Sequence, residues 1–127
     1  MARCPGRPGS RRGPGAGDRW GVTVADPLSE AEIATHLENV PNWRRVGDSI
    51  TAAYRIRYHG GVAMIVHVAD IERLISHHAD IDLRWDHVRF TVTTHDAGYK
   101  LTLADFDLAQ RIDKIAHAHE AVSLVDD

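Results

Sequence analysis

Three histidines are the residues of this chain best suited to chemistry near neutral pH. His77 and His78 are adjacent in the sequence, and His95 follows them later in the chain. The unperturbed pKa of a histidine side chain is about 6.5, so a neutral imidazole can both give and take a proton under physiological conditions. If the segment between them folds back as a hairpin, the three imidazoles could meet in one pocket. Such a pocket suits acid/base catalysis better than covalent or redox chemistry.

The hydrophobic pattern predicts three helices and four strands around these histidines. Apolar residues at helical spacing indicate the helices, and alternating apolar residues indicate the strands. In chain order the expected elements are a helix over 29–39, strands over 43–46 and 50–57, a helix over 62–76, strands over 81–85 and 88–92, and a helix over 102–119. Two capping boxes, Ser29 with Glu32 and Thr102 with Asp105, mark helix starts. A Gly-Gly pair precedes the middle helix.

Two hairpins alternating with helices predict an α+β fold. We expect a four-stranded antiparallel sheet with helices packed on one face, in the order helix-strand-strand-helix-strand-strand-helix. The uncovered face of that sheet would be partly apolar, which predicts a homodimer or homotetramer. The expected domain covers residues 27–120, between a disordered Gly/Pro/Arg-rich tail over 1–26 and a C-terminal tail over 121–127.

Composition and charge exclude several classes of function. The 127 residues carry a formal net charge of −3, but residues 1–19 hold five of the fifteen Lys and Arg and one of the eighteen Asp and Glu. The remainder therefore has ten basic and seventeen acidic residues, or −7, and is a poor binder of nucleic acid. No apolar run is long enough to cross a bilayer. The single cysteine, Cys4, excludes an internal disulfide and a thiolate metal cluster, which fits the reducing cytoplasm.

The N-terminal tail allows two readings besides plain disorder. It lacks the apolar middle segment of a secretory signal. Its arginines could form a nonspecific basic arm. Alternatively, the tail could result from an upstream start assignment, with translation beginning near Val22 or Val24. A peptide covering residues 8–17 in the native protein would contradict that second reading.

The spacing around the three histidines resembles the pattern of the pterin-4a-carbinolamine dehydratases, also called 4a-hydroxytetrahydrobiopterin dehydratases. In that pattern a His-His pair, usually followed by proline, precedes an aromatic residue, a further histidine and an aspartate. Here His77 and His78 are followed in the same register by Trp85, His95 and Asp105. The resemblance covers most of the chain after its N-terminal tail.

The resemblance implies a dehydration of 4a-hydroxytetrahydrobiopterin (pterin-4a-carbinolamine) to a quinonoid dihydropterin, in the recycling of tetrahydrobiopterin. It implies that His77 and His95 are the catalytic acids that assist loss of the hydroxyl group. It also implies that His78 holds the pterin and that Asp105 orients groups around the site. With an aromatic ring at Trp85, these three are the expected substrate-binding residues. The reaction requires no metal and no organic cofactor.

Four features depart from the family pattern. Ala79 stands in place of the usual proline, and Arg73, with Glu72 beside it, stands where an acidic residue is common. Ser76 occupies a position where aspartate is frequent, and the loop over 98–101 is one residue longer than the commonest form. These changes concern the surroundings of the histidines and the fit of a substrate more than the basic reaction.

Two alternatives follow from the same residues. Zinc is bound by His and Asp, but His117 and His119 are two residues apart on a predicted helix and would point away from each other, so we expect no metal site. The other alternative is a noncatalytic interaction or assembly-factor protein, because relatives are implied to act as a dimerisation cofactor for a transcription factor or in Rubisco assembly. Fold alone does not decide between these functions. Three converging histidines favour the enzyme.

Overall fold

The computed structural model describes residues 26–125 and consists of one sheet, three α-helices and a short 3-10 helix. Except for Asp26, the predicted tail over 1–26 lies outside the described residues. In chain order the elements are α2 (Glu30–Leu37), β1 (Arg44–Val46), β2 (Ser49–Arg55), α3 (Tyr58–Ile75), β3 (Asp80–Leu83), β4 (His87–Val92), η2 (His95–Ala97), α4 (Leu103–Ala118) and β5 (Val122–Ser123).

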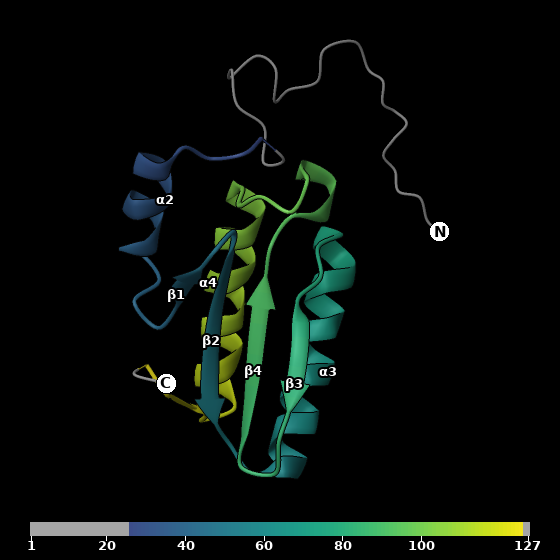
Figure 1. Ribbon diagram of the computed structural model, residues 1–127. Coiled ribbons are helices and arrows are strands. Elements are labelled where there is room, and N and C mark those ends of the chain that lie inside the picture. The colour runs from purple at the N-terminus through teal and green to yellow at the C-terminus, as the bar shows by residue number, and fades with distance from the viewer. Residues whose placement is uncertain (1–25, 126–127) are drawn as a thin grey trace.

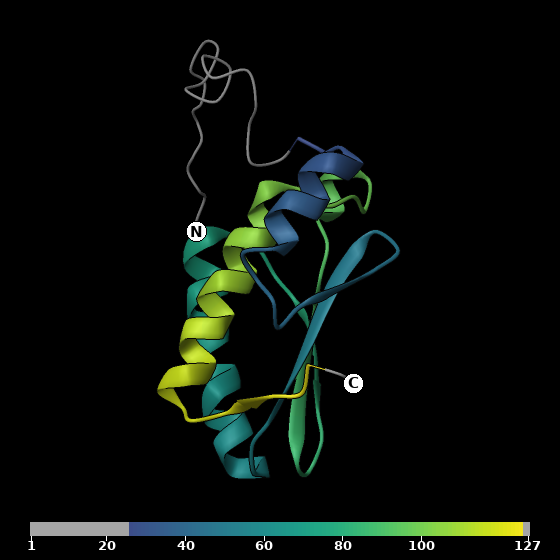
Figure 2. The same cartoon turned by 90° about the vertical axis from the view of Figure 1, so that its left-hand side faces the viewer.

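The sheet and the helices form two layers, which confirms the predicted α+β class. The strand order is β1-β2-β4-β3, and all neighbouring strands are antiparallel (Figure 1). Figure 2 shows α3 and α4 side by side on one face of this sheet. The core between the layers holds side chains such as Tyr54 and Phe90 from the sheet and Met64, Leu108 and Ile112 from the helices. Burial of this apolar area is the main force that holds the layers together.

The capping boxes predicted for the first and last helices are confirmed. Ser29 and Glu32 hydrogen-bond reciprocally across the first turn of α2. Thr102 and Asp105 do the same at the start of α4. In each case a side chain satisfies backbone N–H groups that have no partner within the helix. The second of these caps also fixes the position of Asp105 near the predicted histidines.

The sheet has a fifth strand that the sequence did not predict. β5 pairs antiparallel with β2, with Ser123 opposite Tyr54, and the N–H of Leu124 donates to the carbonyl of Ala53 at 2.9 Å. A strand of two residues is too short to show alternation, so the hydrophobic pattern could not reveal it. The described part of the predicted C-terminal tail is therefore paired with the sheet.

Helix α3 begins at Tyr58, four residues before the predicted start, and includes the two glycines that were expected to interrupt the chain. These glycines serve close packing instead. A Cβ at Gly61 would lie 2.8 Å from Cδ1 of Leu83 on β3, so the missing side chain lets the helix approach the sheet. Although α3 has 18 residues, none of the helices within residues 26–125 combines the length and the apolar character needed to cross a membrane.

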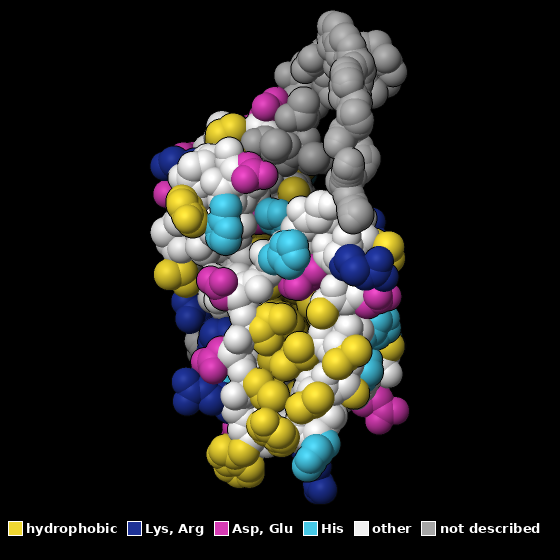
Figure 3. Space-filling model, turned by 90° about the vertical axis from the view of Figure 1, so that its right-hand side faces the viewer, with side chains coloured by type: hydrophobic (Ala, Val, Ile, Leu, Met, Phe, Trp, Pro, Cys, Tyr) yellow, Lys and Arg dark blue, Asp and Glu magenta, His cyan; other side chains and the backbone are white. Residues whose placement is uncertain are grey.

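The uncovered face of the sheet is mainly polar, and the predicted apolar part of it is limited to side chains such as Val46 on β1 and Val122 on β5. Asp82 pairs across the strands with Arg89, and Thr91 lies opposite Thr51 on the same face. Most of the exposed apolar side chains lie elsewhere. Those on α3 are Tyr58, Val62, Val66 and Leu74. Figure 3 shows apolar side chains gathered over α3 and the edge strand β3, next to a group of histidines.

Candidate active site

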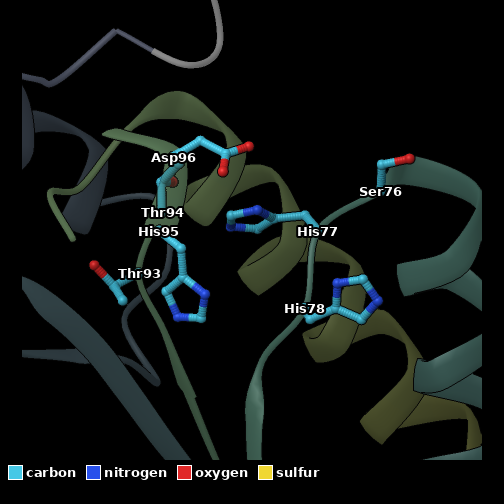
Figure 4. A pocket seen from close by; sticks show the side chains of 7 residues that line it. All are labelled: Ser76, His77, His78, Thr93, Thr94, His95 and Asp96. Atoms are coloured by element: carbon cyan, nitrogen blue, oxygen red, sulfur yellow. The ribbon is translucent and has the colours of Figure 1, made fainter. Parts of the chain in front are cut away.

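A pocket lies where the end of α3 meets the end of β4. Its volume is about 130 Å³, and its lining brings together the three predicted histidines. The lining residues are Ser76, His77, His78, Thr93, Thr94, His95 and Asp96 (Figure 4). The first three form the connection from α3 to β3, and the last four form the connection from β4 into η2. Antiparallel pairing of β3 with β4 brings these two connections to the same end of the sheet.

His77 is held by a buried carboxylate. Its Nε2 lies 2.7 Å from Oδ1 of Asp105, and the two side chains are 12% and 0% exposed. An ionised carboxylate only accepts hydrogen bonds, so the Nε2 of His77 is the nitrogen that carries the hydrogen. The Nδ1 of His77 is then the nitrogen left to exchange a proton with a substrate. This arrangement fixes both the tautomer and the direction of the ring.

The other oxygen of Asp105 is bound by two threonines. Oδ2 accepts from the hydroxyl of Thr94 at 2.8 Å and from the backbone N–H of Thr102 at 2.9 Å. The two threonine hydroxyls are themselves 2.7 Å apart. Both threonines are buried, so the network is shielded from water. The sequence indicated Thr102 as a helix cap, but nothing in the pattern singled out Thr94.

The expected role of Asp105 as a substrate-binding residue needs correction. Its side chain is completely buried and does not line the pocket. Both of its oxygens are occupied by hydrogen bonds to the protein. Asp105 can therefore act on a bound molecule only through His77.

His78 and His95 are both exposed and form two walls of the pocket. Figure 4 shows His77 and His78 extending to opposite sides of the loop that carries them, while the ring of His95 faces the space beside that loop. His95 is the first residue of η2, and its ring centroid lies 4.8 Å from that of Tyr99. The backbone turns back at Gly98, where φ is +72°, a value that glycine adopts without strain.

Trp85 is not brought to the pocket. It lies in the connection between β3 and β4 and is 79% exposed. Leu83 and Val88 pair at that end of the hairpin, whereas the pair of Asp80 and Thr91 lies toward the pocket end. The sequence spacing is correct, but the hairpin places Trp85 at the opposite end of the sheet. Within this chain, Trp85 is therefore neither a residue of the pocket nor a residue of the core.

Near its end, helix α3 contains one buried charged residue that the sequence interpretation noted only as a neighbour of Arg73. Glu72 is 5% exposed, and its Oε2 accepts a hydrogen bond from the backbone N–H of Ala79 at 2.9 Å. Ile71 and Ile75, which are apolar and also lie at helical spacing on α3, are only partly buried. Glu72 follows Val68 by four residues, and that helical spacing was the signal that could have identified it.

His117 and His119, the two histidines considered above as zinc ligands, do not line the pocket. Nε2 of His119 lies 3.2 Å from Nδ1 of His67 on α3. His117 is exposed on α4. Within residues 26–125, no three His, Cys, Asp or Glu side chains are grouped in a way that could hold a metal ion.

Comparison with known proteins identifies the family. The family model for pterin 4 alpha carbinolamine dehydratase matches residues 26–115, a segment that holds the whole pocket. The chain belongs to the pterin-4a-carbinolamine dehydratase family. The predicted resemblance is thereby confirmed at the level of the family.

Two bacterial relatives with similar sequences carry names that assign them provisionally to the pterin-4a-carbinolamine dehydratases. The chain is 39% identical over 97 residues to a Streptomyces avermitilis protein, covering 76% of this chain and 96% of that protein. It is 44% identical over 89 residues to a Chloroflexus aurantiacus protein, covering 69% and 95%. In both cases the match covers nearly the whole length of the relative.

A solved structure shows the same fold. It is the crystal structure of a transcriptional coactivator/pterin dehydratase from Brucella melitensis, with a TM-score of 0.68 and 21% sequence identity. The match covers 72% of this chain and 99% of that chain. The two proteins thus share one fold over most of this chain.

Proposed function

We propose that the protein eliminates water from 4a-hydroxytetrahydrobiopterin to give the quinonoid dihydropterin. One observation carries the proposal: three histidines from two different connections line one pocket, and one of them is oriented by a buried carboxylate. Family membership supplies the class of substrate. The geometry supplies groups able to move protons.

The reaction breaks the bond between the C4a carbon and its hydroxyl oxygen. The hydroxyl group leaves as water after it receives one proton, and a ring nitrogen of the pterin loses one proton, so the elimination is balanced without an oxidant or reductant. His77 and His95 are the proposed acids: the protonated imidazole of one of them gives its proton to the hydroxyl group, and the neutral imidazole that results takes up the proton lost from the ring nitrogen. Positioned acid/base groups of this kind contribute about 10²- to 10⁴-fold to a rate. His78, on the other side of its loop, is the proposed binding residue for the pterin ring.

The function is tested by following the ultraviolet absorbance of freshly generated 4a-hydroxytetrahydropterin with and without the full-length protein. We expect the wild type to accelerate its disappearance. His77→Ala and His95→Ala should each lower kcat by about 100-fold or more, and His78→Ala should act mainly by raising KM. His117→Ala, an exposed histidine outside the pocket, is the matched control and should leave both constants unchanged. Normal rates in both the His77 and His95 variants would refute the proposed roles.

A noncatalytic interaction function is the second candidate. It is favoured by the apolar side chains exposed on α3 and by the Brucella melitensis relative, whose name combines coactivator with dehydratase. The same assay separates the two functions. A folded wild-type sample that does not accelerate the spontaneous reaction would favour the interaction protein.

We also propose that the chain forms a homodimer or homotetramer. Exposed apolar side chains on α3 include Val66 and Leu74, which are 65% and 64% exposed. Apolar patches that are exposed in one chain commonly become buried in an oligomer. The oligomeric state does not enter the proposed proton transfers, which use side chains of a single chain.

A further inference from the structure

The buried face of α3 contains one charged residue. Its buried positions are Gly61, Met64, Val68 and Glu72, at successive spacings of three or four that place them on one face of the helix. The first three are small or apolar, as a face against the core requires. A carboxylate at the fourth position is unfavourable for packing alone, since burial removes it from water. Its presence indicates a specific partner.

That partner is the loop that carries two of the pocket histidines. The backbone carbonyl of Glu72 accepts from the N–H of Ser76 and, at 3.2 Å, from the N–H of His77. Its side-chain Oε2 accepts from the N–H of Ala79 at 2.9 Å. His77 and His78 therefore lie between two points of the loop that are both hydrogen-bonded to one residue.

The loop between those points requires an external restraint. Ser76 adopts a left-handed conformation with φ 57° and ψ 42°, which is uncommon for a residue other than glycine or asparagine. At the other side of the histidines, Ala79 has no side chain that could hydrogen-bond, and its N–H is the group that Glu72 holds. A charged acceptor makes the stronger type of hydrogen bond to such a group.

We propose that Glu72 is a positioning residue for the His77–His78 loop, a role that rests on the proposed dehydratase function of the pocket. Its carboxylate holds the N–H of Ala79 so that His77 meets Asp105 and His78 extends to the opposite side. Glu72 does not line the pocket, so it acts through the backbone of the loop. Small displacements of a catalytic group, on the order of 1 Å, are enough to lower a rate substantially.

Three variants test this role in the full-length protein. Glu72→Leu supplies an apolar side chain that suits the buried face but cannot accept from Ala79, and its kcat/KM should fall by about 10- to 100-fold. Glu72→Gln keeps an amide oxygen that can accept the same hydrogen bond and should restore most of the activity. Asp70→Leu replaces an exposed acidic residue of the same helix and serves as the matched control, with unchanged kcat/KM.

A second set of variants, made in the Ala79→Pro protein, isolates the hydrogen bond between Ala79 and Glu72. Ala79→Pro removes the N–H that Glu72 binds and restricts the loop by the proline ring. In that background Glu72→Leu should change kcat/KM much less than it does in the wild-type background, because the two residues act as one unit. Equal losses in both backgrounds, or no loss in the wild-type background, would overturn the proposal. If Glu72→Leu does not fold in the wild-type background, its effect can still be measured in the Ala79→Pro background.

Hydrogen exchange separates this proposal from the proposed function. The amide of Ala79 should exchange faster in Glu72→Leu than in the wild type, and at close to the wild-type rate in Glu72→Gln. If the wild type accelerates no dehydration, the dehydratase function fails, but the exchange rates and the ring signals of His77 and His78 still report whether Glu72 holds the loop. Unchanged Ala79 exchange in Glu72→Leu would overturn the positioning role, whatever the activity.

Discussion

At the scale of single residues, the pocket depends on which nitrogen of His77 carries a hydrogen. The Nε2 of His77 faces Asp105, whose other oxygen is bound by Thr94 and the backbone of Thr102. Because these groups are buried, water cannot replace any of the hydrogen bonds, and the tautomer is determined by the protein. A change that preserves the shape of Asp105 but not its charge should therefore lower activity in a protein that still folds.

Asp105→Asn makes that change. The amide can present its NH₂ group toward His77, which would then have to accept at Nε2 and carry its hydrogen on Nδ1. We expect kcat to fall by at least about 10-fold and the free energy of unfolding to fall by about 1–3 kcal/mol. Initial rates and urea unfolding measure the two effects. Asp107→Asn, at an exposed position of the same helix, should change neither, and a wild-type kcat in Asp105→Asn would contradict the role of the tautomer.

At the scale of elements, a second carboxylate joins the sheet to α4 away from the pocket. Oδ1 of Asp113 accepts from the indole Nε1 of Trp43 at 3.0 Å, from the hydroxyl of Tyr54, and from Asn42 at 3.5 Å. Trp43 and Tyr54 are both buried core residues. Trp43 lies just before the first hairpin, and Tyr54 lies within it. These hydrogen bonds determine how the hairpin sits against the helix, and none of them reaches the histidines.

Replacement of this carboxylate should lower stability without lowering activity. In Asp113→Ala the Tyr54 hydroxyl and the Trp43 N–H lose their acceptor inside the protein, and each unsatisfied group costs about 1–3 kcal/mol. Urea unfolding should show the loss, whereas kcat under folding conditions should stay near that of the wild type. Asp107→Ala, which breaks only an exposed pair with Arg111, should cost less than about 1 kcal/mol. A large fall in kcat for Asp113→Ala would show that α4 transmits strain to the pocket.

The same contact predicts how stability changes in alkaline solution. Burial of Tyr54, followed by the negative charge of Asp113, raises the pKa of its hydroxyl well above the usual value of 10.0. The folded protein keeps Tyr54 neutral while the unfolded chain ionises it, so the stabilisation is complete below about pH 10 and is lost as the pH rises further. This residue alone gives a slope of about 1.4 kcal/mol per pH unit.

Urea unfolding between about pH 8 and pH 11 measures that slope. The free energy of unfolding should decline less steeply above about pH 10 in Tyr54→Phe than in the wild type, because the variant has no hydroxyl to ionise at this position. Tyr58→Phe, at a residue that is 46% exposed, should keep the wild-type slope. Equal slopes in the wild type and Tyr54→Phe would contradict the raised pKa.

The sequence predicted the elements better than it predicted their packing. The capping boxes and the alternation of Val88, Phe90 and Val92 depend on neighbours in the chain and could be recognised directly. Gly61 could not, because its role is the close approach of Leu83, which lies on another element. The burial of Glu72 could be inferred from its spacing from Val68, but its partner could not, since that partner is a backbone N–H beyond the end of its own helix.

At the scale of the whole molecule, the local sequence patterns were interpreted correctly, but the positions of their residues in space depend on the fold. Trp85 has the expected spacing from the histidines but lies at the far end of the β3–β4 hairpin. The uncovered face of the sheet was expected to be partly apolar, but it is mainly polar, with Asp82 and Arg89 as cross-strand partners on it. The expectation of an oligomer therefore rests on α3, and a variant on this helix can test it.

Val66 and Val46 offer a matched pair for that test. Val66 lies on α3 and is 65% exposed, whereas Val46 lies on β1 and is 50% exposed. We expect sedimentation velocity to show the wild type as a dimer or tetramer, and Val66→Lys to shift it toward the monomer, because burying an unpaired charge in an interface is unfavourable. Val46→Lys should leave the assembly unchanged. A wild type that sediments as a monomer at every protein concentration would refute the oligomer, and dissociation by Val46→Lys alone would move the interface from α3 to the polar face of the sheet.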